Sequence, residues 1–217
     1  MRRKDRPKPR SALGKAWHFI WEDDSLLSWV VNIILAIVLI KFVVYPGLGL
    51  LLGTQFPIVA VVSDSMEHKD FAKTQRLPFD EWWQARGEFY EEKNISYEDF
   101  QKFPYKKGFN MGDLMVLRGT SPSKIKTGDI LVFRGWQQEP IIHRVVEVKI
   151  ADGKYFFQTK GDNNPDSIRA SQSCPICDET SITEDMLVGR AVLRIPYLGW
   201  VKIAAVSMFL AIVNAFR

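Results

Sequence analysis

The chain is poor in the side chains that bind metal ions tightly. Its 217 residues include only two cysteines and three histidines. Cys174 and Cys177 form a single Cys-Pro-Ile-Cys motif, whereas a structural zinc site normally takes four ligands, and His18, His68 and His143 are not spaced to complete one. We therefore expect no metal and no cofactor. The motif is interpreted as two thiols or a local disulfide in a surface loop.

The sequence also lacks the signature of a nucleic-acid-binding protein. Much of the formal net charge of +4 comes from the basic N-terminal tail, residues 1–25, and no aromatic residue lies in its first ten positions. Aromatic side chains interleaved with basic ones are typical of proteins that bind single strands. We expect no nucleic-acid partner. A basic tail of this kind instead suits the cytoplasmic flank of a membrane segment.

One long hydrophobic run follows the tail. Leu26–Val44 is almost entirely apolar, and at about 1.5 Å per residue a helix of this length reaches roughly 28 Å, close to the hydrocarbon thickness of a bilayer. Lys41 lies near the end, where its side chain can reach the headgroups. A buried soluble helix is one alternative. A cleaved signal peptide is another, but the run is too long and has no small-x-small exit, so we predict an uncleaved transmembrane anchor at 26–46.

A second apolar run closes the chain and is predicted to form a hydrophobic helix. Tyr197 and Trp200 suit an interfacial belt, while Lys202 and Asn214 interrupt the run. The prediction is a second transmembrane helix over 197–217. A helix lying in the membrane plane and a buried helix remain open alternatives.

The region between the two runs, residues 47–196, is predicted to be a mainly β domain on the extracytoplasmic side. Its apolar and β-branched segments are short and are separated by turns, as at Ala151–Lys154, where a hairpin is expected. The predicted strands are Ile58–Val62, Leu114–Leu117, Ile130–Phe133, Ile141–Val148, Tyr155–Thr159 and Leu187–Ile195.

Residues 68–110 interrupt this pattern of strands. Charged and aromatic residues alternate there, and the stretches 79–93 and 96–102 are compatible with helices. Because the aromatic residues need burial, we predict an insertion that packs on the domain rather than a disordered linker.

Three kinds of side chain in the domain could support acyl transfer, which needs a nucleophile, a base and a group that orients the base. Ser65 follows the first predicted strand, and His143 lies within a later strand, where a neutral imidazole could accept the hydroxyl proton. His68 is the second candidate for the base. Asp162 and Asp166 are candidates for the orienting carboxylate. Each residue also has an ordinary interpretation, as a turn residue or as a packed histidine.

Four sequence boxes follow one another along the chain: Ser65-Met66, Gly128–Phe133, His143–Val146 and Lys160–Asn164. In this order they resemble the boxes of type I signal peptidases and specifically of the archaeal and endoplasmic-reticulum branch. That branch has a histidine where the bacterial branch has a lysine base. The resemblance extends over most of residues 45–195.

The resemblance implies a membrane-bound serine endopeptidase, a hydrolase that removes N-terminal signal peptides from exported preproteins. It implies a fold of coiled antiparallel sheets, Ser65 as nucleophile and His143 as base. The Ser63 hydroxyl and the Ser65 backbone N–H would form the oxyanion hole. In the family a second acid follows the Asp-Asn turn by about six residues, whereas Asp166 follows Asp162 by four. We favour Asp166 as the orienting acid and Asp162 as the residue that holds the turn; the reverse assignment stays open.

The resemblance also implies partners and a location. Expected partners are preproteins with small residues at the −1 and −3 positions, the lipid bilayer and the translocation machinery. The shallow pockets would be lined by residues near Ile58–Val62 and Ile141–Val145. We expect the cell membrane as the location, with the catalytic domain outside.

Other classes of protein compete with this interpretation. A self-cleaving regulatory protease usually has a lysine base and a DNA-binding module. An inactive membrane-anchored β domain could bind a secretion partner, and a membrane-surface scaffold could serve the translocation machinery. A histidine base predicts activity that rises with pH through the range in which histidines lose a proton.

Overall fold

The computed structural model describes residues 11–70, 75–201, 203, 204, 207, 208 and 211. The chain divides into two compact units, residues 1–50 and 51–217. The first ten residues of the predicted tail lie outside the described part. The same holds for much of the predicted second transmembrane helix at 197–217.

Two helices at the N-terminal end are joined through side chains. The Ser28 hydroxyl donates to the Phe19 carbonyl at 2.5 Å, and the Asn32 amide donates to the Ile20 carbonyl at 2.8 Å. Both helices begin at a serine whose side chain caps the first turn, Ser11 and Ser25. The helical elements are α1 (Ala12–Trp21), α2 (Leu26–Leu39), a π-helical turn η1 (Ile40–Val44) and α3 (Tyr45–Leu52).

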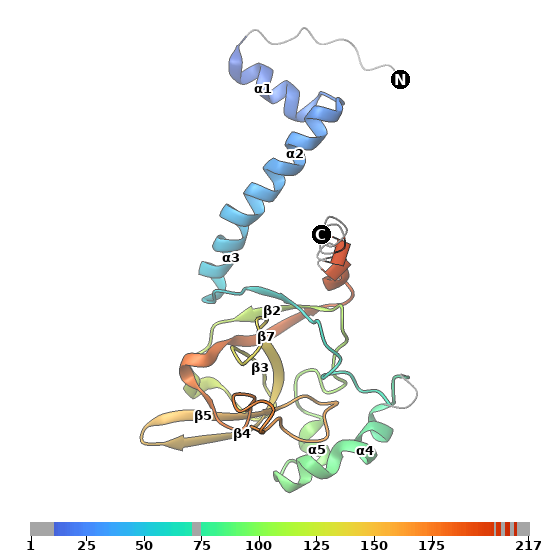
Figure 1. Ribbon diagram of the computed structural model, residues 1–217, viewed down its shortest axis with the longest axis vertical. Coiled ribbons are helices and arrows are strands. Elements are labelled where there is room, and N and C mark those ends of the chain that lie inside the picture. Colours follow the sequence, from blue (N-terminus) through green and yellow to red (C-terminus); the bar gives the residue numbers. More distant parts are fainter. Residues whose placement is uncertain (1–10, 71–74, 202, 205–206, 209–210, 212–217) are drawn as a thin grey trace. The chain divides into compact units, whose positions relative to one another are not determined.

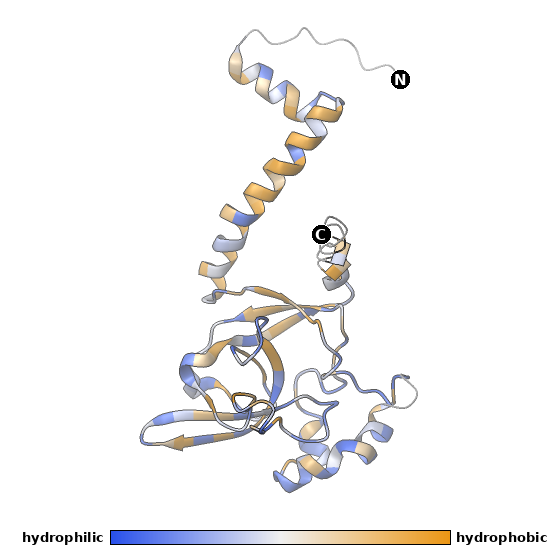
Figure 2. Ribbon diagram, in the orientation of Figure 1, coloured by the Kyte–Doolittle hydropathy of each residue, from blue (hydrophilic) through white to orange (hydrophobic). Residues whose placement is uncertain are grey.

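The helix Leu26–Leu52 is long and apolar enough to cross a membrane. It has 27 residues, and it is the one helix in the described part of the chain that meets this length and composition. Most of its residues are hydrophobic, as the colours of the ribbon in Figure 2 show. It continues past the predicted end at residue 46. Pro46 lacks an N–H group, and the π-turn just before it adapts the helix to the missing hydrogen bond.

The second unit is built on one antiparallel sheet of seven strands in the order β1-β2-β7-β3-β4-β5-β6. The sheet curls (Figure 1), which confirms the predicted mainly β fold. The predicted β4–β5 hairpin is present, with its turn at Asp152 and Gly153. The strands are β1 (Ile58–Ala60), β2 (Leu114–Arg118), β3 (Ile130–Phe133), β4 (Ile141–Ala151), β5 (Lys154–Lys160), β6 (Ile182–Thr183) and β7 (Leu187–Ile195).

Irregularities in strand pairing bend the sheet around its core. The register shifts in β4 between Val145 and Glu147, and also in the β2–β7 and β3–β7 pairs. Such bulges increase local twist and curvature. Apolar side chains of the two faces form separate clusters, one around Met115 and Ile130 and one around Leu131 and Phe157.

The insertion forms two helices that lie beside the sheet (Figure 1), α4 (Phe79–Glu92) and α5 (Tyr97–Phe100). Their buried aromatic residues make a third cluster, which Val146 of β4 joins. Because this contact buries the aromatic faces of the helices, α4 and α5 pack on the domain through β4. The members of this aromatic cluster are Trp82, Trp83, Tyr90, Ile95, Phe100 and Val146. Short 3₁₀ turns elsewhere in the domain are η2 (Pro122–Lys124) and η3 (Glu184–Met186).

Candidate active site

Ser65 lies in a turn shortly after β1, where the chain leaves the edge of the sheet. The next residue, Met66, is fully buried in the core and its carbonyl accepts the Phe109 N–H at 3.0 Å. The Ser65 carbonyl accepts the Asn163 N–H at 2.8 Å. The backbone of Ser65 and Met66 is therefore fixed by the domain, while the Ser65 side chain remains partly exposed.

His143 of β4 brings an imidazole to the Ser65 hydroxyl. The distance between Ser65 Oγ and His143 Nε2 is 3.0 Å. His143 pairs with Leu131 of the central strand β3, and only 4% of its surface is exposed. The strand therefore holds the ring at hydrogen-bonding distance from the hydroxyl, which is the arrangement of a nucleophile with its general base. The two residues that the sequence suggested for these places do lie together.

The carboxylate beside His143 belongs to Glu179, which the sequence did not single out. Glu179 Oε2 lies 2.5 Å from His143 Nδ1, and the same oxygen accepts the Thr159 hydroxyl at 2.9 Å. Glu179 Oε1 accepts the Ile168 N–H at 2.7 Å. The backbone of Glu179 is also hydrogen-bonded: its N–H donates to the Ile168 carbonyl, and its carbonyl accepts the Thr159 N–H. This fully buried carboxylate is therefore held rigidly against the imidazole.

The expectation that Asp166 orients His143 is corrected by this geometry. Asp166 is exposed, and its carboxylate accepts the Ser167 N–H at 2.6 Å and lies 3.5 Å from the Arg169 guanidinium. The imidazole Nδ1 is bonded to Glu179 and not to Asp166. In the sequence, Glu179 is an acid three residues before the β-branched pair Ile182 and Thr183, and this position is only a weak indication of a functional role.

Asp162 lies beneath the site as the centre of a buried polar network. Its carboxylate accepts two hydrogen bonds from Arg144, at 2.9 and 2.7 Å, one from the Tyr90 hydroxyl at 2.9 Å and one from His68 Nε2 at 3.1 Å. Burial alone would raise the pKa of Asp162, but Arg144 and His68 outweigh it and hold the pKa well below its ordinary value. Asp162 is therefore a carboxylate that binds Arg144 and His68 rather than His143.

The second candidate base, His68, is committed to this network. It is almost completely buried, and its ring stacks on Trp82 with centroids 3.6 Å apart and planes 5° from parallel. Burial lowers the pKa of His68, although Asp162 opposes the shift. Its Nε2 is hydrogen-bonded to Asp162, so the ring of His68 contacts Asp162 and Trp82 rather than the Ser65 hydroxyl.

Lys160 is a buried cation next to the same turn. Its ammonium group donates to the Gly161 carbonyl at 3.1 Å and to the Asp162 carbonyl at 3.3 Å, and it lies 4.6 Å from the centre of the Tyr90 ring. Burial lowers the pKa of Lys160 to about 8. The chain thus has a lysine close to the site, but it binds carbonyls of the turn while His143 faces Ser65.

A pocket of about 220 Å³ opens beside the hydroxyl. The Ser63 hydroxyl lies 3.1 Å from Ser65 Oγ at its edge. Both segments expected to line a substrate pocket contribute, because Ala60 and Val62 come from one and Ile141 and Ile142 from the other. The sequence did not indicate the remaining walls, which are Trp136, Gln137, Pro140, Asn164 and Ile168.

The segment that leads to Glu179 is closed by a disulfide. Cys174 and Cys177 are bonded, with their Cα atoms 5.3 Å apart. Of the two expectations for this motif, the structure has the disulfide. It forms a small loop between Ile168 and Glu179, two residues that are themselves hydrogen-bonded to each other.

Ser65, His143 and Glu179 thus place a hydroxyl, an imidazole and a carboxylate within hydrogen-bonding distance in series, which is the order of groups in a catalytic triad. No family model matches the chain. The chain is 29% identical over 162 residues to the human signal peptidase complex catalytic subunit SEC11C, covering 74% of this chain and 62% of that protein. It is 27% identical over 185 residues to SEC11 of Schizophyllum commune, covering 74% of this chain and 70% of the relative.

A bacterial relative is also similar over a shorter region. Signal peptidase I W of Bacillus subtilis is 32% identical over 72 residues, which are 33% of this chain and 36% of that protein. These matches confirm the resemblance carried by the four boxes: the chain is similar to signal peptidase catalytic subunits of eukaryotes and to a bacterial signal peptidase I. Together with the apolar N-terminal helix, the homology indicates association with a membrane.

Proposed function

We propose that this protein is a membrane-bound serine endopeptidase that removes signal peptides from preproteins, with Ser65 as nucleophile and His143 as general base. One observation carries the proposal: Ser65 Oγ lies 3.0 Å from His143 Nε2, while Glu179 Oε2 lies 2.5 Å from His143 Nδ1. Homology to signal peptidases supplies the substrate class.

The first half of the reaction forms an ester on Ser65. Ser65 Oγ attacks the scissile carbonyl carbon as its proton passes to His143 Nε2, and Glu179 stabilises the resulting imidazolium. The Ser63 hydroxyl and the Ser65 N–H are proposed to donate to the oxyanion. His143 then gives its proton to the leaving amine, which becomes the N-terminus of the mature protein.

The second half restores the enzyme. His143 accepts a proton from water as the water oxygen attacks the ester carbonyl, and the protonated His143 returns a proton to Ser65 Oγ. The signal peptide leaves with a new carboxylate. The small pocket beside Ser65 supports a preference for small side chains at the −1 and −3 positions.

The location and partners belong to the same proposal. The helix Leu26–Leu52 is proposed to anchor the protein in the cell membrane, with the basic tail in the cytoplasm and the β domain that follows Leu52 outside. Substrates would be preproteins still held in the bilayer by their signal peptides, which raises their effective concentration at the site. The translocation machinery is the expected protein partner.

The proposal is tested by cleavage of a preprotein by the purified full chain in liposomes, with intact mass and the new N-terminus as the measurement. We compare the wild type with Ser65→Ala and with Ser171→Ala, a control that removes an exposed serine hydroxyl bonded only locally to its neighbours Ser173 and Cys174. Wild type and Ser171→Ala should cleave after a small-x-small site, and Ser65→Ala should not. Equal cleavage by Ser65→Ala would remove Ser65 as the nucleophile.

A further inference from the structure

Two side chains of helix α4 contact the turn that lies against the candidate nucleophile. The Tyr90 hydroxyl donates to Asp162 Oδ1 at 2.9 Å, and Arg86 Nε donates to the Asn163 carbonyl at 3.1 Å. Both acceptors lie in the turn Gly161–Asn164, which follows β5. The insertion is therefore connected to the site through hydrogen bonds as well as through apolar packing.

The turn is in direct contact with Ser65 and His143. The Asn163 N–H donates to the Ser65 carbonyl at 2.8 Å. At Gly161 there is no space for a side chain, since a Cβ there would lie 2.8 Å from the Ser65 carbonyl oxygen and 2.9 Å from His143 Nε2. A shift of this turn by a fraction of an ångström therefore changes the position of Ser65 relative to His143.

Asp162 transmits the contact from the insertion to the rest of the site. Its carboxylate is completely buried and is bonded to Tyr90, to His68 and to Arg144, the neighbour of His143 in β4. All three partner side chains of Asp162 touch the aromatic cluster of the insertion, because Tyr90 belongs to it, His68 stacks on Trp82 and Arg144 lies over the Phe100 ring. The orientation of the turn thus depends on where α4 lies.

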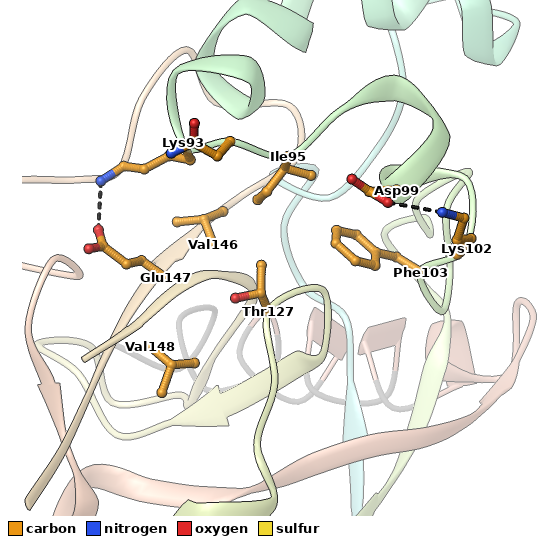
Figure 3. Close-up of a pocket in the computed structure, with 10 residues that line it drawn as sticks. Lys93, Ile95, Asp99, Lys102, Phe103, Thr127, Val146, Glu147 and Val148 are labelled. Carbon is orange, nitrogen blue, oxygen red and sulfur yellow. Dashed lines mark hydrogen bonds and ion pairs between the residues drawn. The ribbon is translucent and has the colours of Figure 1, made fainter. Parts of the chain in front are cut away.

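The insertion is fixed to the strand that carries His143. Figure 3 shows Lys93, just after α4, reaching Glu147 of β4, while Ile95 faces Val146. The Lys93 ammonium lies 2.7 Å from Glu147 and 2.8 Å from the Gln158 side-chain oxygen of β5. Helix α4 is therefore held by β4 and β5 at its end while Arg86 and Tyr90 contact the turn that follows β5.

We propose that Tyr90 and Arg86 are positioning residues that hold Ser65 at its reactive distance from His143 through the turn Gly161–Asn164. This inference rests on the proposed function and assigns a role in that reaction to the insertion. Neither side chain touches the reacting atoms. Their effect is to reduce the number of arrangements that the turn and Ser65 can adopt, which is the entropic part of catalysis.

Tyr90→Phe removes one hydroxyl and keeps the ring in the aromatic cluster. Tyr97→Phe is the matched control, because Tyr97 belongs to the same insertion and its hydroxyl also donates to an aspartate, Asp80, at 2.5 Å, but it does not contact the turn. We expect Tyr90→Phe to lower kcat for preprotein cleavage about tenfold with KM unchanged. Tyr97→Phe should leave both constants at the wild-type values.

Hydrogen exchange gives a readout that does not require turnover. The Asn163 amide, which is bonded to Ser65, should exchange faster in Tyr90→Phe than in the wild type or in Tyr97→Phe. Arg86→Met should have the same two effects. Arg86→Lys should recover part of kcat, since a lysine could still donate to the Asn163 carbonyl.

The outcomes separate this inference from the proposed function. If the wild type cleaves and Ser65→Ala does not, but Tyr90→Phe and Arg86→Met keep the wild-type kcat, the positioning role is overturned and the proposed function stands. Equal losses in Tyr90→Phe and Tyr97→Phe would assign the effect to general destabilisation of the insertion and would also overturn it. A wild type that cannot cleave would overturn both.

Discussion

Replacing Glu179 by glutamine tests whether this carboxylate fixes the working form of His143. The change keeps the size of the side chain and removes its charge. Glu179 accepts hydrogen bonds at both oxygens in the structure, from His143 and Thr159 at Oε2 and from Ile168 at Oε1. A carboxylate can accept at both positions, whereas an amide has only one accepting atom.

Either orientation of the glutamine amide breaks part of this arrangement. With its NH₂ group toward His143, the amide would donate to Nδ1 and move the imidazole proton to Nε2, the atom that must accept the Ser65 proton. With its oxygen toward His143, its NH₂ group would face the Ile168 N–H, and two donors would meet in a buried site. The second arrangement costs about 1–3 kcal/mol in folding free energy, so the first should dominate.

The expected result for Glu179→Gln is a loss of kcat between about 100-fold and 10,000-fold, because the imidazole has the wrong tautomer and its charged form has lost a carboxylate partner. The assay is single-turnover cleavage of a preprotein by full-length protein in liposomes, with circular dichroism to verify folding. Glu184→Gln is the matched control, since Glu184 Oε1 accepts the exposed Tyr155 N–H at 2.8 Å and lies outside the site. A folded Glu179→Gln protein with wild-type kcat would refute the orienting role.

Two further predictions concern the groups around the site. Ser63→Ala should lower kcat by about 100-fold to 1,000-fold with little change in KM if the Ser63 hydroxyl donates to the oxyanion, and steady-state cleavage with a fall of less than tenfold would contradict that role. Because burial lowers the pKa of Lys160 to about 8, while an unfolded lysine titrates near about 10.4, the unfolded state holds the proton more tightly between these pH values. The free energy of unfolding should therefore rise by up to about 3 kcal/mol from pH 8 to about pH 10.4, and urea titrations of Lys160→Met should lose that rise.

Six of the seven strands and helix α4 could be predicted because local patterns determine them, whereas α1 and β6 were not predicted. The predicted strand Ile130–Phe133 has the observed bounds, and the predicted helical stretch 79–93 corresponds to α4, Phe79–Glu92. Runs of β-branched and apolar residues between turns give the strands, while aromatic and charged residues at helical spacing give α4. The apolar N-terminal helix follows from composition alone, and in the structure it runs to Leu52 rather than to residue 46.

The candidate nucleophile Ser65 and the candidate base His143 could be proposed because each lies in a sequence box that resembles a known one. Glu179 has no such box. It reaches His143 because the chain between Asn164 and Glu179 folds back so that the Glu179 carbonyl accepts the Thr159 N–H of β5. Pairing between residues 20 positions apart, across a loop closed by a disulfide, depends on the tertiary fold and leaves no local pattern.

The two buried carboxylates near Ser65 and His143 belong to Asp162 and Glu179, whereas the sequence suggested Asp162 and Asp166. Asp162 cannot orient His143, because both of its oxygens are occupied by Arg144 and its remaining capacity by Tyr90 and His68. The cation that lowers its pKa also binds the carbonyls of Pro104, Tyr105 and Gly128, so Asp162 stabilises the contact between the insertion and the sheet. With Asp162 committed to Arg144, the acid for His143 must come from another segment. Glu179 is the carboxylate that the fold brings to Nδ1, and this explains why Asp166 can remain at the surface.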